Sequence, residues 1–139
     1  MLPFFLEMMM SSQYWRFQYN ADALKEIIDS GKLVFPELNA NAAGKYNTVE
    51  KVVSDMSLGA FIILANFNLN DRSATVKAAG IVTDVSDSAV CVQWKKLIPS
   101  LSLVPHKIGA EQWREEPVFL MNLPRAREFK LDKLKNKHF

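Results

Sequence analysis

The residues with the clearest chemical potential are aromatic rings and side-chain amides. The chain holds three tryptophans, three tyrosines and nine phenylalanines. Six asparagines lie in or beside two polar segments, at Asn39, Asn41, Asn47, Asn66, Asn68 and Asn70. Aromatic faces can stack on a nucleobase that has left its helix, while amides and main-chain groups hydrogen-bond its edge. This combination predicts a protein that binds a flipped base, and the rings at element ends or in loops are Tyr19, Tyr46 and Trp113.

No arrangement of nucleophiles, acids or metal ligands indicates an enzyme. The carboxylate pairs at 84 and 87 and at 115 and 116 fall in expected turns, where they are solvated. The single cysteine, Cys91, lies within an expected strand, where a small buried apolar side chain is usual. The sequence contains neither a glycine-rich phosphate loop nor a Gly-x-Ser-x-Gly motif. We therefore expect no catalysis, no metal and no cofactor.

Basic residues are concentrated at the end of the sequence. Residues 125–139 hold six lysines and arginines against two acidic residues, although the whole chain has a net charge of only +2. Such a segment adds affinity for phosphate or for an acidic partner, and a solvated helix face is the plainer interpretation. If this segment binds phosphates, we expect the contacts from Arg125, Arg127, Lys130 and Lys133.

Length and composition suit one folded domain. The 139 residues are 49% apolar and 23% charged, which excludes global disorder. The first ten residues are mostly apolar, but Glu7 interrupts them and no small-x-small cleavage site follows, so a secretory signal is not expected. No apolar run reaches the roughly 18 residues of a membrane span, and we expect a cytoplasmic protein. We divide it into an apolar segment at 1–13, a domain at 14–124 and a basic helix or tail at 125–139.

Apolar periodicity predicts a sheet-rich domain. We expect strands at 14–20, 61–67, 75–85, 89–97 and 118–122, of which 61–67 is apolar throughout and central. We expect helices at 21–30, at 48–56 and from 124 onward, a helical turn at 111–115, and an extended link from Pro99 to Pro105. Gly80 and the two alanines before it allow something bulky to approach the third strand closely.

Short polar turns join the strands between residues 61 and 97, which favours antiparallel pairing. An open sheet exposes its edge strands. We therefore expect an α+β fold in which a small, curled, mostly antiparallel β-barrel is flanked by short helices.

The order of several short motifs resembles the PUA-like superfamily, and more narrowly its EVE and YTH branch. The chain presents Tyr-Trp-Arg-Phe at 14–17, a helix at 22–30, Met-Ser-Leu-Gly at 56–59, a strand at 60–67 and Ala-Gly-Ile-Val-Thr-Asp at 79–84. Val-Cys-Val-Gln-Trp at 90–94 then runs into Lys-Lys-Leu-Ile-Pro. Ala60 stands where the family commonly has an acidic residue, and Gly80 is the one glycine kept of the next motif.

The resemblance implies a PUA-like, EVE-like barrel that reads a modified base, with a pocket around the end of the first strand. Carried over by position, the pocket residues are Gln18, Tyr19 and Asn20, joined by Asn66 and Asn68 from the central strand. A further aromatic residue from Tyr46 or Trp113 would complete a cage. The resemblance favours DNA over RNA as the target, and it implies a nuclease or ATPase partner in restriction or defence. The alternative is a protein–protein interaction module that uses the apolar segment at 1–13 and a sheet edge.

Overall fold

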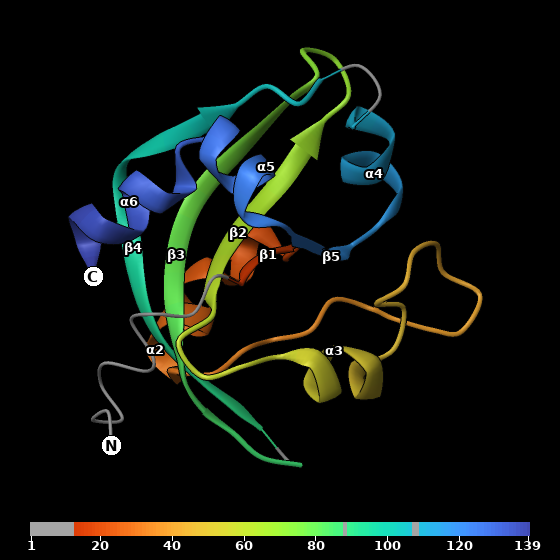
Figure 1. Cartoon of the computed structure of the whole chain (residues 1–139), viewed down its shortest axis with the longest axis vertical. Helices are drawn as coiled ribbons and strands as arrows, with labels where there is room; N and C mark the ends of the chain where they lie inside the picture. Colours follow the sequence, from red (N-terminus) through yellow and green to blue (C-terminus); the bar gives the residue numbers. More distant parts are fainter. Residues whose placement is uncertain (1–12, 88, 107–108) are drawn as a thin grey trace.

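One five-stranded sheet forms the centre of the molecule (Figure 1). The computed structural model describes residues 13–87, 89–106 and 109–139. The strand order is β4-β3-β2-β1-β5, and β1 pairs with β2 in parallel while the other pairs are antiparallel. The strands are β1 (Tyr14–Phe17), β2 (Phe61–Asn68), β3 (Ser73–Val85), β4 (Val90–Leu103) and β5 (Val118–Met121). The helices are the 3-10 helix η1 (Ala21–Ala23) and the α-helices α2 (Leu24–Ser30), α3 (Val49–Asp55), α4 (Ala110–Glu115), α5 (Leu123–Glu128) and α6 (Leu131–His138). The expected α+β class is confirmed.

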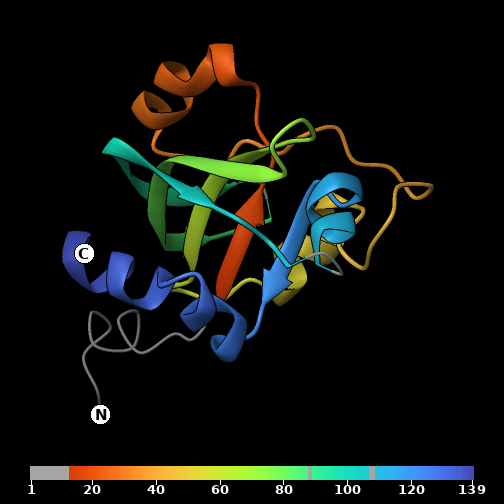
Figure 2. The same cartoon turned by 90° about the horizontal axis from the view of Figure 1, so that it is seen from above.

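Helices cover both faces of the sheet (Figure 2). Strand side chains alternate between the faces, so Trp15, Phe17 and Ile62 pack on one side with residues of α2 and α3. Phe61 and Ile63 pack on the other side with residues of α4, α5 and α6. The central strand β2 and its neighbour β1 are therefore buried on both faces, which explains the continuous apolar run of β2.

The expected barrel is wrong, because the sheet is open, with β4 at one edge and β5 at the other. A barrel would need hydrogen bonds between these two strands, and the described residues pair them nowhere. Closure is also unnecessary for burial, since the helical layers already shield both faces. A different feature limits the exposed main chain at each edge. β5 has only four residues, and an isolated bridge between Lys32 and Cys91 covers part of β4.

The link expected between Pro99 and Pro105 is wrong in part, because β4 continues to Leu103. A proline lacks the N–H that a central strand needs, but an edge strand can turn that position away from its neighbour. Pro99 lies in such an edge strand, where the register with β3 shifts between Val76 and Ala78. The pairing of β4 with β3 is therefore interrupted at residues 97–100 and resumes at Leu101.

The close approach expected at Gly80 is confirmed. Gly80 pairs with Trp94, and a Cβ atom at this glycine would lie 2.7 Å from Cε3 of that indole. The main-chain oxygen of Gln93 would stand 3.0 Å away. Only a residue without a side chain lets β3 and the indole of β4 pack together here.

The basic end of the chain forms two helices instead of the single one expected. Lys130 separates α5 from α6 with a left-handed backbone, at φ 59°. Ala126 and Leu131 are fully buried against the sheet, so both helices belong to the packed core.

Candidate functional site

A cavity of about 540 Å³ opens where β1 has ended, η1 begins and the β2–β3 hairpin turns. This volume lies in the usual range for small-ligand sites. We call it the amide cavity, because three asparagines contribute to its wall. The lining residues are Tyr19, Ala21, Asn66, Phe67, Asn68, Leu69, Asn70, Thr75 and Lys77.

Asn66 holds the wall of the amide cavity together. Its Oδ1 accepts from the main-chain N–H of Tyr19 at 3.0 Å, and its Nδ2 donates to the main-chain oxygen of Tyr19 at 2.8 Å. The parallel ladder between β1 and β2 stops at Phe17 and Leu64. The side chain of Asn66 thus adds one more rung after the strand has ended, and this fixes Tyr19 beside β2.

Tyr19 is the lining residue that carries a phenol hydroxyl. The residue is 8% exposed, and its ring packs within the core cluster of the α2 and α3 face. Its hydroxyl has no hydrogen-bond partner among the described residues. Every buried side-chain oxygen or nitrogen in the described part of the chain does have a partner. The hydroxyl therefore reaches solvent. Burial raises the pKa of this phenol above its ordinary value, so it stays protonated and able to donate.

The hairpin supplies the remaining hydrogen-bonding groups. Asn68 accepts from the main-chain N–H of Asn70 at 2.8 Å, which leaves its Nδ2 unbonded within the described chain. The antiparallel register pairs Asn66 with Thr75 and Asn68 with Ser73, and so brings β3 residues to the same cavity. Lys77 follows on β3 with an exposed side chain.

The lining contains one cation, Lys77, and no acidic residue. Amides, a phenol and a hydroxyl suit a neutral ligand with a polar edge, and Phe67 adds a partly buried ring. A carboxylate wall, which would repel phosphate, is missing from the lining. The cavity can therefore hold a planar polar ring that has a phosphate attached.

The structure brings together only some of the residues that the sequence singles out. Tyr19, Asn66 and Asn68 line the amide cavity. Gln18 is exposed and donates its main-chain N–H to Pro117, and the side chain of Asn20 caps η1 by accepting from the N–H of Asp22 at 3.0 Å. Neither of these two belongs to the lining.

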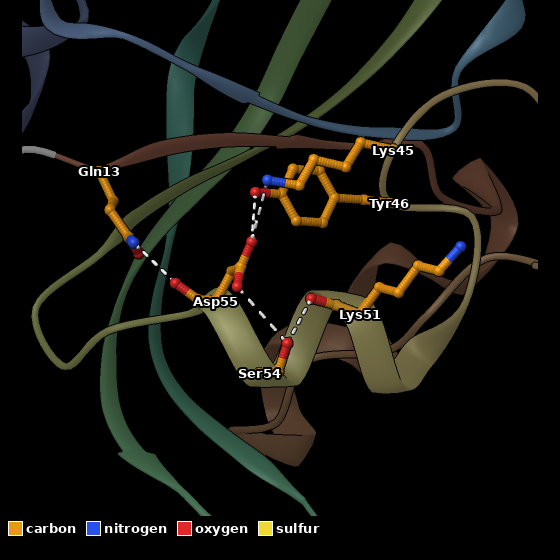
Figure 3. A network of polar contacts seen from close by, with 6 residues as sticks. All are labelled: Gln13, Lys45, Tyr46, Lys51, Ser54 and Asp55. Carbon is orange, nitrogen blue, oxygen red and sulfur yellow. Dashed lines mark hydrogen bonds and ion pairs between the residues drawn. The ribbon is translucent and has the colours of Figure 1, made fainter.

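Tyr46 lies at the other end of β1. Its ring packs edge-on against Trp15, with 4.7 Å between centroids, and its hydroxyl donates to Asp55 at 2.7 Å. Figure 3 shows Lys45 and Tyr46 converging on this carboxylate, while Gln13 donates to the main-chain oxygen of Asp55. The hydrogen bond from Tyr46 lowers the pKa of the Asp55 carboxyl. This network ties the 36–48 loop to α3, and it contributes nothing to the amide cavity.

Trp113 lies on the α4–α6 face of the sheet, opposite the α2–α3 face on which Tyr46 packs. It is 2% exposed and stands edge-on to Phe119 and Phe129, at centroid distances of 5.1 and 5.8 Å. The guanidinium of Arg16 lies 5.1 Å from its ring centroid. Trp113 is thus a core residue of the α4–α6 face and cannot stack on a ligand in the amide cavity.

Arg16 was not singled out by the sequence, because it shares a strand face with polar neighbours. It is 1% exposed, its Nε donates to the oxygen of Ala65 and its Nη1 to the oxygen of Glu116, both at 2.8 Å. Burial lowers its pKa to about 10. Arg16 thereby joins β2 to the turn before β5, which is a structural role.

The basic residues of the C-terminal helices lie on the α4–α6 side, away from η1. Arg125 donates to Gln112 at 2.6 Å, and Arg127, Lys130 and Lys133 are exposed. The amide cavity and the expected phosphate contacts therefore lie on different elements: the cavity is lined by residues that follow β1 and by the β2–β3 hairpin, and the basic residues belong to the α5–α6 segment. Lys77 was not predicted as a site residue from the sequence. Pairing β2 with β3 around the polar turn would have placed Lys77 near Asn66.

Comparison of the chain with protein-family models, with curated proteins and with solved structures finds no match. Within the described ranges, no three His, Cys, Asp or Glu side chains gather as a metal site would require. No helix in the described part of the chain has the length and hydropathy needed to span a bilayer.

Proposed function

We propose that this protein is a non-catalytic reader of nucleic acid that holds one flipped base in the amide cavity. The observation that carries the proposal is the lining itself: three asparagines, a tyrosine and one lysine, with no carboxylate. Three residues expected to form a base pocket, Tyr19, Asn66 and Asn68, meet there from two separate parts of the chain.

Each lining group has a role in this proposal. The Tyr19 hydroxyl and the Asn68 Nδ2 donate to acceptors on the base edge, since neither is used within the described chain. The ring of Phe67 offers a contact face, and base–aromatic stacking is worth roughly 1–3 kcal/mol. Lys77 neutralises the attached phosphate. Asn66 is a positioning residue, because both ends of its amide are bonded to Tyr19.

That the base is modified, and that DNA is the target, rests on the resemblance to the EVE and YTH branch. The succession of β1, α2, β2, β3 and β4 follows the motif order of that resemblance and supports the proposal. An open sheet in place of a barrel departs from it. A nuclease or ATPase partner, a role in restriction or defence, and a cytoplasmic location belong to the same proposal.

The direct test is fluorescence anisotropy with one labelled duplex made in four forms: unmodified, N6-methyladenine, 5-methylcytosine and 5-hydroxymethylcytosine. We expect one modified form to bind at least tenfold more tightly, which is about 1.4 kcal/mol. Equal binding of all four forms would contradict the reader function and would indicate a protein that binds only the nucleic-acid backbone. Absence of binding at low salt would remove nucleic acid altogether.

A matched pair of variants assigns the binding to the amide cavity. Asn68 and Asn39 make the same local turn, each accepting from the main-chain N–H two residues ahead at 2.8 and 2.9 Å. Only Asn68 lines the cavity. We expect Asn68→Ala to lose the preference for the modified form and Asn39→Ala to keep it. If the two variants behave alike, the cavity is not the site.

A second candidate function is a protein-interaction module, favoured by the open edge of β4. Ile98 on this strand is 84% exposed, and among the described residues the main-chain bonds to the outer side of β4 come from residues 31–33 and reach only Val90 and Val92. Edge strands can receive a strand from a partner. Retention on heparin only at low salt, together with failure of all four duplexes to bind, would favour this candidate.

A further inference from the structure

Leu69 stands at the tip of the β2–β3 hairpin and is 63% exposed. Large apolar side chains at such exposure are few among the described residues, and this one sits between polar neighbours in a tight turn. It lines the amide cavity on one side. On the other side it lines a second hollow, of about 330 Å³.

The second hollow lies toward α4. Besides Phe67 and Leu69, which it shares with the amide cavity, it is lined by Arg72, Ala110, Glu111 and Arg114. Arg114 also pairs with Glu115 at 3.0 Å. Figure 2 shows the hairpin projecting between the η1–α2 segment and α4. The hairpin therefore separates a neutral, amide-rich cavity from a hollow that carries two arginines and one carboxylate.

Hydrogen bonds between residues close in sequence fix the conformation of the hairpin tip. Asp71 accepts from the main-chain N–H of Ser73 at 3.1 Å and from its hydroxyl at 2.7 Å. Asn68 closes the other half of the turn on Asn70. Arg72 completes the turn in a left-handed conformation, at φ 53°. Leu69 thus projects from a preformed support instead of a loose loop.

A base that leaves a duplex leaves a gap in the stack, and proteins that unstack DNA commonly insert an apolar wedge such as leucine at the step they open. The wedge must lie beside the pocket that receives the base, and cations must lie near the backbone that it forces apart. Leu69 meets the first condition through the shared wall, and Arg72 and Arg114 meet the second.

We propose that Leu69 is the wedge that enters a duplex and fills the place of the base taken into the amide cavity. This inference rests on the proposed function and adds to it that the target is double-stranded. A single strand needs no wedge, because its bases are already free to leave their neighbours.

The test uses the three modified duplexes and the corresponding labelled single strands, each with 2-aminopurine next to the test base. The fluorescence of 2-aminopurine rises when its neighbour leaves the stack. For Leu69→Ala we expect at least a tenfold loss of affinity for the duplex that the wild type prefers and loss of the fluorescence rise. We expect less than a twofold change for the single strand.

Ile98→Ala is the control, because Ile98 is an isomer of leucine that is also largely exposed and lines neither hollow. It should bind like the wild type, and thermal melting should show both variants folded. The wedge is overturned if Leu69→Ala binds the duplex like Ile98→Ala, if it loses duplex and single strand equally, or if the wild type binds single strands alone. Failure of the wild type to bind either probe would instead overturn the proposed function.

Discussion

Removing the side chain of Asn66 tests whether its amide holds β1 and β2 together beyond the end of their ladder. Asn66→Ala removes two hydrogen bonds to Tyr19, at 3.0 and 2.8 Å, and leaves a main-chain donor and acceptor in a partly buried place. A typical intramolecular hydrogen bond contributes about 1 kcal/mol, and a buried group left without a partner costs about 1–3 kcal/mol. We expect the free energy of unfolding to fall by about 2–3 kcal/mol.

Urea denaturation followed by tryptophan fluorescence measures this loss, because Trp15 in β1 and Trp94 in β4 belong to the same core cluster. Asn39→Ala is the matched control, since it removes one exposed turn hydrogen bond and should cost a few tenths of a kcal/mol. Asn66→Asp keeps the acceptor for the Tyr19 N–H but loses the donor, so its loss should exceed that of the control. A loss below about 0.5 kcal/mol for Asn66→Ala would refute the structural role of this amide.

Three further outcomes follow from contacts described above. Gly80→Ala should destabilise the fold by about 1–3 kcal/mol through overpacking, whereas Gly109→Ala, whose nearest neighbour would lie at 3.6 Å, should cost far less in the same urea titration. The lowered pKa of Asp55 contributes stability that is present at a pH above 3.8, its ordinary value, and is lost as the pH falls through the lowered pKa. Tyr46→Phe removes the main cause of this shift, so its free energy of unfolding should fall less steeply than that of the wild type when the pH is lowered in this range. Arg16→Lys should cost about 2–3 kcal/mol, because an ammonium cannot reach both main-chain carbonyls that the guanidinium bridges, and chemical denaturation would show no change if the bridge were unimportant.

Local patterns predict the elements that depend on local pairing. The continuous apolar run at 61–67, the polar turn after it and the returning strand are where the sequence places them, because a hairpin needs only neighbouring residues. The helix end at Gly31 is also confirmed, with a left-handed backbone at φ 63°. Gly80 could be interpreted correctly for the same reason, since its partner Trp94 lies on the next strand.

Alternation misleads where a strand is buried on both faces. Arg16 and Tyr14 share a face that contains polar residues, yet they are 1% and 4% exposed because β5 and the α4–α6 layer cover them. The open sheet was not predicted from the sequence, because the residue pattern of the strands does not indicate that helices will cover both faces.

The three predicted residues that meet at the candidate site, Tyr19, Asn66 and Asn68, were named by their position in the resemblance, and the strand register explains why they meet. The parallel pairing of β1 with β2 brings Tyr19 and Asn66 to one end of the sheet, and the hairpin adds Asn68. Tyr46 and Trp113 come from a long loop and a short helix, whose direction relative to the sheet depends on tertiary packing. They carry aromatic rings of the expected kind, but they pack at the other end and on the other face.

The position of β1 also governs the order in which the molecule can assemble. Residues 14–17 pair with residues 61–64 on one side and with residues 118–121 on the other. Contacts between such distant residues close long loops and slow folding. The segment between β1 and β2 is shorter than the segment between β1 and β5, so pairing with β2 costs less loop-closure entropy and is expected first. The sheet therefore lacks its β5 edge, and Arg16 lacks its bond to Glu116, until residues 116–121 have packed against β1.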